Sequence, residues 1–149
     1  MTDTNLVGLA SEIIPGLFQG RCPKTAADLR AYMVEKITAS VGLSPGAAMD
    51  ADFLPGELKM MWPIGDDSWL PSGSIIRAIA AMVSMLLDDG HKVLVCCDAG
   101  MNRSGLVVAR TLIHRGMPPE RAVALIRERR DPAALSNAAF VKWLLQEAE

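Results

Sequence analysis

The sequence predicts an α/β fold in which helices flank a central, mostly parallel sheet of four to five strands. Short runs rich in apolar residues alternate along the chain with segments of helical periodicity, which is the pattern typical of such sheets. The run Lys92-Val-Leu-Val-Cys-Cys97 is almost continuously apolar, as a central strand buried on both faces is expected to be. No repeat and no glycine- and serine-rich linker divides the 149 residues, so residues 1–149 are predicted to form one domain.

The N-terminal part is expected to supply two strands with a helix between them. The first strand spans residues 16–20 and is bounded by glycines. Thr25 is positioned to cap a helix over residues 26–36, whose apolar residues at helical spacing are Leu29, Met33 and Ile37. A second strand is expected within residues 37–43. Residues 44–58 contain two prolines and two glycines and are predicted to form an irregular connection.

The middle of the chain is expected to form a strand followed by a long helix. Residues 59–64 are the strand, and Pro63 places it at a sheet edge or at the end of the strand. Ser72 or Ser74 is positioned to cap a helix that runs to about Asp88. The predicted buried face of this helix consists of Ile76, Ile79, Val83 and Leu86.

Three helices are expected after the central strand. The first covers residues 104–115, and a glycine ends it. The second opens with two prolines and covers residues 118–130. The third covers about residues 136–147, with inward-facing side chains Phe140, Leu144 and Leu145. The basic cluster at the end of the second helix is expected to be solvated and consists of Arg127, Arg129 and Arg130.

The composition argues against several classes of partner. The net charge is −2 and the pI is near 5.7, whereas nucleic-acid binding needs a basic surface. The longest markedly apolar stretch, residues 79–87, is too short to span a bilayer. The N-terminal segment lacks the features of a signal peptide, and three cysteines, two of them adjacent, suit a reducing compartment. The sequence therefore predicts a cytoplasmic protein with no nucleic-acid and no membrane partner.

The segment from Cys97 to Arg103 has the strongest chemical signal in the chain. A buried strand brings Cys97 to the carboxyl edge of the sheet, where ligand sites of open α/β sheets lie. Arg103 opens the next helix. If the intervening chain curls around a centre, its N–H groups form an anion-binding nest with the helix N-terminus behind it. The residues predicted to bind phosphate in this cradle are Asp98, Ala99, Gly100, Met101, Asn102 and Arg103.

This cradle predicts a cysteine-dependent phosphatase. The helix and backbone dipoles favour the thiolate form of a cysteine in this setting. The planar guanidinium of Arg103 can hold two phosphate oxygens at once, which a lysine cannot do. The thiolate of Cys97 then attacks phosphorus and forms a phosphocysteine intermediate. Ser104 is positioned to donate a hydrogen bond to that thiolate.

Departure of the leaving group needs a proton donor on its side of the cradle. Asp66 and Asp67 follow an expected strand and should emerge at the same edge of the sheet, so one of the two is predicted to be the general acid. Asp98 is less suited to this role, because inside the cradle it would point away from the leaving group or repel phosphate. The residue pattern alone does not choose between Asp66 and Asp67.

The segment Val95-Cys-Cys97-Asp-Ala-Gly-Met-Asn-Arg103-Ser104 resembles the signature loop of the dual-specificity branch of protein tyrosine phosphatases. Residues 11–20 are similar to the opening strand motif of that family, and Trp62-Pro-Ile-Gly-Asp66-Asp67 lies where the family carries its acid loop. The closing helices are similar in residues 122–130, Asn137 and Phe140. The resemblance covers nearly the whole chain. It implies a protein tyrosine phosphatase-like fold and phosphotyrosine, phosphoserine or phosphothreonine substrates, with no metal and no organic cofactor.

One residue departs from the family pattern. The family usually has a histidine just before the nucleophile, where this chain has Cys96. A redox pairing of Cys96 with Cys97 is disfavoured, because successive side chains of a strand face opposite ways. Cys22 is a second redox candidate. The resemblance leaves two positions for the general acid of the family. If this chain is aligned with the family from Pro63 forward, the acid falls on Asp66, and if it is aligned from Pro71 backward, the acid falls on Asp67.

The cradle contains no lysine, which favours a phosphorylated protein or peptide, or a small phosphoester, over a highly charged phosphoinositide. Two other functions fit part of the pattern. A non-catalytic phosphate-binding pseudophosphatase is suggested by the missing histidine. A sulfurtransferase of the rhodanese type also places a cysteine in an anion-binding loop, although Asp66 and Asp67 have no role in that reaction.

Overall fold

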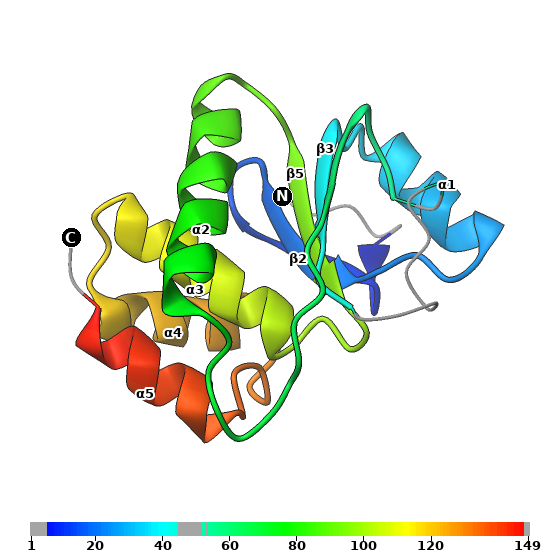
Figure 1. Cartoon of the computed structure of the whole chain (residues 1–149). Helices are drawn as coiled ribbons and strands as arrows, with labels where there is room; N and C mark the ends of the chain where they lie inside the picture. Colours follow the sequence, from blue (N-terminus) through cyan, green and yellow to red (C-terminus); the bar gives the residue numbers. More distant parts are fainter. Residues whose placement is uncertain (1–5, 45–51, 53, 148–149) are drawn as a thin grey trace.

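The computed structural model describes residues 6–44, 52 and 54–147 and contains a five-stranded sheet in the order β1-β2-β5-β3-β4 (Figure 1). The strands are β1 (Ala10–Ile14), β2 (Leu17–Arg21), β3 (Ala39–Gly42), β4 (Leu58–Met61) and β5 (Val93–Cys97). β1 pairs antiparallel with β2, and all the other neighbours are parallel. The predicted α/β class, with a mostly parallel sheet and β5 at its centre, is confirmed. Most of the connection predicted over residues 44–58 lies outside the described residues.

In the described residues, five helices cover the two faces of this sheet. They are α1 (Ala26–Val34), α2 (Gly73–Asp88), α3 (Arg103–His114), α4 (Pro119–Arg129) and α5 (Ala138–Gln146). Figure 1 shows α1 on one side of the sheet and α2 to α5 on the other. Each helix begins and ends within two residues of its predicted bounds, because side-chain caps mark several of the ends. Thr25 caps α1, Ser72 caps α2 and Asn137 caps α5.

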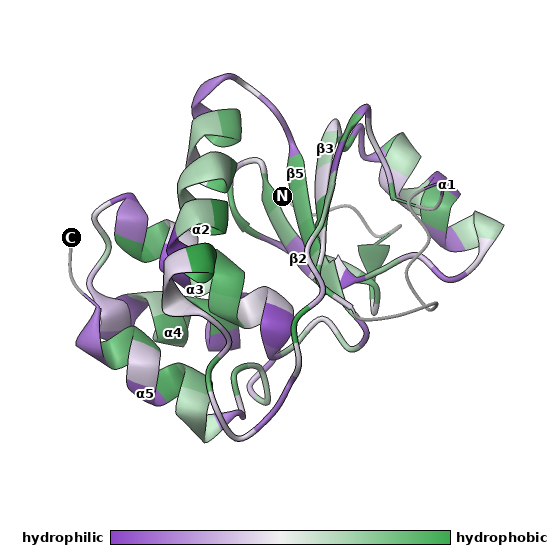
Figure 2. Cartoon of the chain, viewed as in Figure 1, coloured by the Kyte–Doolittle hydropathy of each residue, from purple (hydrophilic) through white to green (hydrophobic). Residues whose placement is uncertain are grey.

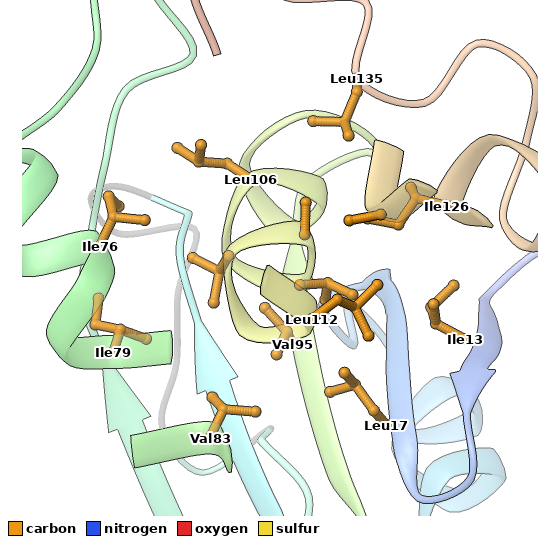
Figure 3. Close-up of a cluster of buried hydrophobic side chains, with 14 of the residues drawn as sticks. Ile13, Leu17, Ile76, Ile79, Val83, Val95, Leu106, Leu112, Ile126 and Leu135 are labelled. Atoms are coloured by element: carbon orange, nitrogen blue, oxygen red, sulfur yellow. The ribbon is translucent and has the colours of Figure 1, made fainter. Parts of the chain in front are cut away.

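The hydrophobic core lies on both faces of β5. Val93, Val95 and Cys97 face the large cluster under α2 to α5, whereas Leu94 and Cys96 face a smaller cluster on the α1 side. Figure 3 shows side chains from three strands, from α2 and from α4 gathered around α3. Figure 2 shows β5 as hydrophobic and the turn between α2 and β5 as hydrophilic. This packing fixes the strand that ends at Cys97.

Within the described part of the chain, no helix is long and apolar enough to cross a membrane.

One predicted inward-facing position is wrong, because Leu145 is 45% exposed, whereas its predicted neighbour Leu144 is fully buried. Met33, one of the apolar residues at helical spacing in α1, is 60% exposed, and the preceding residue, Tyr32, is fully buried. Consecutive residues of a helix point about 100° apart, so each of these helices packs through its buried side chain and leaves the next one in solvent. Tyr32 also fixes α1 by donating a hydrogen bond to the carbonyl of Arg21 at 2.6 Å.

Glu147 ties the end of α5 to two other helices. Its carboxylate accepts hydrogen bonds from Arg77 of α2 at 2.7 and 2.9 Å and from Arg110 of α3 at 2.9 Å. The Glu147 side chain is 12% exposed and that of Arg110 is 4% exposed. The hydrogen bonds from Arg77 hold the pKa of Glu147 below its ordinary value of 4.5.

The Glu147→Gln variant is expected to lose about 2 kcal/mol of unfolding free energy at neutral pH, since hydrogen bonds to charged groups are lost. A depressed pKa in the folded state stabilises above the unfolded-state pKa, and this stabilisation disappears as pH falls through the folded-state pKa. The difference from wild type should therefore shrink below pH 4.5. Urea unfolding at neutral and at acidic pH measures it.

Glu128→Gln is the matched control, because Glu128 lies 3.8 Å from its partner Arg121 and both side chains are mostly exposed. It should change stability by less than about 0.5 kcal/mol. A loss in Glu147→Gln that stays the same at every pH would contradict this account.

Candidate active site

The carboxyl ends of three strands meet where β5 ends at Cys97. Arg21 of β2 lies opposite Cys97 in the sheet register, and Gly42 of β3 lies opposite Cys96. The N–H of Cys22 donates to the carbonyl of Cys97 at 2.9 Å, and the N–H of Leu43 donates to that of Cys96 at 2.9 Å. The strand end is therefore held from both sides, and Cys97 is delivered to the edge that the sequence predicted.

The N-terminus of α3 faces the sulfur of Cys97. The backbone N–H of Ser104 donates to Sγ at 3.4 Å, and Oγ of Ser104 lies 3.4 Å from the same sulfur. Ser104 is the second residue of α3, and N–H groups in the first turn of a helix have no partner inside the helix. The positive end of the α3 dipole thus lies against the thiol.

The loop of residues 98–102, called the cradle loop below, connects Cys97 to α3. Gly100 has a φ of +70°, and a Cβ there would lie 2.5 Å from the carbonyl carbon of Gly20. Both conditions require glycine. The carbonyl of Gly100 accepts hydrogen bonds from Gln19 at 3.2 Å and from Arg130 at 2.9 Å. Gln19 also donates to Met101, and Arg130 to Ala99.

The guanidinium of Arg103 lies beside the cradle loop and is 11% exposed. One of its terminal nitrogens donates to the carbonyl of Ile64 at 3.3 Å, and the other to Oδ2 of Asp98 at 3.4 Å. The other carboxylate oxygen of Asp98 accepts from the hydroxyl of Ser44 at 2.9 Å. Nε of Arg103 is buried and has no hydrogen-bond partner among the described residues.

Asp66 is in direct contact with the cradle loop. Its Oδ2 accepts a hydrogen bond from the amide of Asn102 at 3.1 Å, and its Oδ1 accepts one from the amide of Asn137 at 2.7 Å. Asn102 in turn accepts from the backbone N–H of Asn137 at 2.9 Å. The β4–α2 loop, the cradle loop and the α4–α5 loop therefore meet at one pocket of about 370 Å³, lined by Asp66, Asp67, Ser68, Asn102, Ser136, Asn137, Ala138 and Ala139.

Asp67 has a different environment. Its carboxylate lies over Gly65, where an added Cβ would overlap with its Oδ2. Only its backbone carbonyl accepts from Asn137, and its carboxylate makes no hydrogen bond to another described residue. The structure thus brings the carboxylate of Asp66, and not that of Asp67, to the cradle loop.

The three cysteines are free thiols, and Cys97 is separated from the other two by the sheet. Cys22 and Cys96 lie together in the cluster on the α1 side, whereas Cys97 faces α2 to α5. Burial raises the pKa of the Cys96 thiol, and a hydrogen bond with Cys96 lowers the pKa of Cys22. The thiol that replaces the family histidine therefore points away from Cys97.

The prediction of a solvated basic cluster at the end of α4 holds for Arg127 and Arg129, which are exposed, but Arg130 is half-buried and all three guanidinium groups also bond backbone carbonyls. Arg127 donates to the carbonyls of Ala134 and Leu135, Arg129 donates to that of Ile13, and Arg130 donates to the cradle loop. These carbonyl acceptors are distant in sequence or lie in irregular turns, so the helical periodicity of α4 does not predict the hydrogen bonds.

Two further residues at the site were missed. The pattern places Gln19 only within a strand, although a polar residue in an otherwise apolar strand indicates a buried partner. Only the family resemblance indicates Asn137, which also caps α5. Across the described residues, no group of three or more His, Cys, Asp or Glu side chains is placed to hold a metal ion.

Comparison with known proteins gives a consistent result. A family model of the dual specificity phosphatase catalytic domain matches residues 27–149. Protein tyrosine phosphatase type IVA 3 from Bos taurus is 37% identical over 78 residues, which are 51% of this chain and 44% of that protein. The Mus musculus protein of the same name is 35% identical over 78 residues, which again are 51% of this chain and 44% of that protein. The matched segment thus spans less than half the length of these curated relatives.

Two solved structures are similar over almost the whole chain. Tk-PTP in its active form has a TM-score of 0.79 and 25% identity, over 93% of this chain and 97% of that chain. The human tyrosine phosphatase-like serine/threonine/tyrosine-interacting protein has a TM-score of 0.74 and 25% identity, over 92% and 93% of the two chains.

Proposed function

This chain belongs to the dual specificity phosphatase family, and from that premise we propose that it hydrolyses phosphomonoesters through a phosphocysteine on Cys97. The proposed substrates are phosphotyrosine, phosphoserine and phosphothreonine in proteins or peptides, and residues 1–149 are proposed to be one catalytic domain. The observation that carries the proposal is a buried thiol at a helix N-terminus beside an arginine whose buried Nε has no hydrogen-bond partner among the described residues.

Arg103 supports the binding of an oxyanion. A buried donor without an acceptor costs about 1–3 kcal/mol, and Nε of Arg103 is such a donor. A phosphate oxygen next to the cradle would accept from it, and a guanidinium matches two oxygens of one phosphate. The contacts with Ile64 and Asp98 hold the guanidinium in place before substrate binds.

In the first chemical step, the thiolate of Cys97 attacks phosphorus in line. The S–P bond forms while the bond from phosphorus to the leaving oxygen breaks, and that oxygen takes a proton from the carboxyl group of Asp66. Arg103 and the N–H groups of the cradle loop stabilise the charge on the remaining three oxygens. Asp66 is proposed as the acid because its carboxylate, unlike that of Asp67, is held at the cradle loop by two amides.

In the second step, a water molecule attacks the phosphocysteine. The carboxylate of Asp66 takes its proton, the P–S bond breaks, and inorganic phosphate and the thiolate are released. Oγ of Ser104, 3.4 Å from Sγ, is placed to donate a hydrogen bond to the departing sulfur.

A rapid-quench experiment tests the proposal. Hydrolysis of p-nitrophenyl phosphate is followed in the presence of a chelator, and acid-quenched protein is analysed by mass spectrometry of the peptide that contains Cys97. We expect turnover without metal and a phosphoryl group on Cys97. Phosphopeptide binding with no turnover would identify a binding module instead, and thiocyanate formation from thiosulfate and cyanide would identify a sulfurtransferase.

A further inference from the structure

We propose that Arg130, which caps the C-terminus of α4, and Gln19, in β2, are positioning residues that hold the cradle loop in its anion-binding shape. The proposal rests on the proposed function, since it concerns the same loop. It assigns a role to two residues that do not touch the reacting atoms.

Three successive carbonyl groups of the cradle loop are held from outside. Nε of Arg130 donates to the carbonyl of Gly100 at 2.9 Å, and one of its terminal nitrogens donates to that of Ala99 at 3.3 Å. Nε2 of Gln19 donates to Gly100 at 3.2 Å and to Met101 at 3.4 Å. The loop backbone is therefore fixed by two side chains from different elements, Gln19 of β2 and Arg130 at the end of α4.

This arrangement decides where the N–H groups of the loop point. In a trans peptide the N–H and the C=O point in opposite directions. Holding the carbonyls of Ala99, Gly100 and Met101 outward therefore turns the N–H groups of the following residues inward, which produces an anion nest. A peptide flip at Gly100 would instead place a carbonyl oxygen against the phosphate.

The burial of Gln19 has no other evident benefit. Its side chain is fully buried in β2, beside Val95 of the central strand. Burying an amide costs free energy unless its polar atoms are bonded. Its Nε2 makes only the two contacts with the loop, and its Oε1 has no partner among the described residues. An apolar side chain at position 19 would stabilise the core more than an amide does. We therefore attribute the amide to its hydrogen bonds with the cradle loop.

The shape of the guanidinium explains why position 130 is an arginine. Two of its nitrogens bond two successive carbonyls, which matches the planar fork of arginine and not the single ammonium of lysine. The positive charge of Arg130 also lies next to the cradle loop, which is proposed to bind a doubly charged phosphate group. Both the charge and the geometry of Arg130 therefore favour phosphate binding. A comparison of arginine, lysine and an apolar residue separates these two contributions.

The test measures tungstate affinity by isothermal titration calorimetry, together with kcat and KM for p-nitrophenyl phosphate. Arg130→Met is expected to weaken tungstate binding about tenfold, through the loss of its hydrogen bonds to the loop. Arg130→Lys keeps the charge but loses the fork, so it should recover only a small part of the lost affinity. Arg129→Met is the matched control, since Arg129 donates to the carbonyl of Ile13, at 3.4 Å, and not to the cradle loop.

Gln19→Met supplies a readout that a purely structural role would not produce. It should weaken tungstate binding about threefold to tenfold, while the free energy of unfolding stays the same or rises, because a buried amide is removed. A loss of binding that only follows a loss of stability would overturn the role of Gln19.

Three other results would overturn the proposal. They are wild-type affinity in Arg130→Met, full recovery in Arg130→Lys, and an equal loss in Arg129→Met. Since tungstate binding needs no turnover, these results are distinct from a failure of the proposed function, which would appear as tungstate binding without hydrolysis.

Discussion

Replacing Cys97 with serine is expected to lower kcat for p-nitrophenyl phosphate on the order of 10⁴-fold or more, as for the loss of other covalent nucleophiles. A serine hydroxyl is a far weaker acid and nucleophile than a thiol, so the first bond to phosphorus does not form. Tungstate affinity should change little, because Arg103 and the loop N–H groups remain. The substitution is nearly isosteric at a buried position, so the fold should persist.

Cys96→Ser is the matched control for this experiment. Cys96 is the preceding residue of the same strand and is equally buried, but it faces the α1 side of the sheet. Its replacement should lower kcat by less than about tenfold, since its side chain lies across the sheet from the thiol of Cys97. Equal losses in the two variants, or an active Cys97→Ser protein, would contradict the proposed nucleophile.

Replacing Asp66 with asparagine is expected to lower kcat about 10²- to 10³-fold for esters with poor leaving groups, which need a proton. The loss should be smaller for p-nitrophenyl phosphate, whose leaving group departs without much help. Asp67→Asn should lower kcat by less than about tenfold for either ester, because its carboxylate is not held at the cradle loop.

The measurement compares kcat for a series of aryl and alkyl phosphates in wild type, Asp66→Asn and Asp67→Asn. A steeper dependence on the leaving group in Asp66→Asn identifies the proton donor. A larger effect of Asp67→Asn would transfer the role to that residue and would mean that the β4–α2 loop rearranges when substrate binds.

Local features of the chain predict the strand, the cradle loop and the following helix. The apolar run of β5, the glycine at position 100 and the start of α3 lie within a few residues of each other, so their signals do not depend on distant contacts. The helix ends are also local, because caps such as Ser72 bond N–H groups three residues ahead. These parts agree with the structure to within two residues.

Contacts between distant segments account for what the residue pattern missed. Asp66 meets Asn102 and Asn137 across 36 and 71 residues of sequence. Gln19 reaches Gly100 across 81 residues. The exposure of Met33 depends likewise on which side of α1 the sheet covers. Periodicity identifies a helix but does not say how it is rotated against its neighbours.

The residue pattern predicts the fold class, the family and the proposed pair Cys97 and Arg103, because each of these depends on a pattern that is continuous along the chain. Only the folded chain shows which aspartate lies at the cradle loop, which side chains hold its carbonyl groups, and that Cys96 lies across the sheet from Cys97. The physical reason is that these features depend on hydrogen bonds and packing between segments that are far apart in the sequence. The segments are β2, the β4–α2 loop and the connection from α4 to α5, and folding brings them together at the cradle loop.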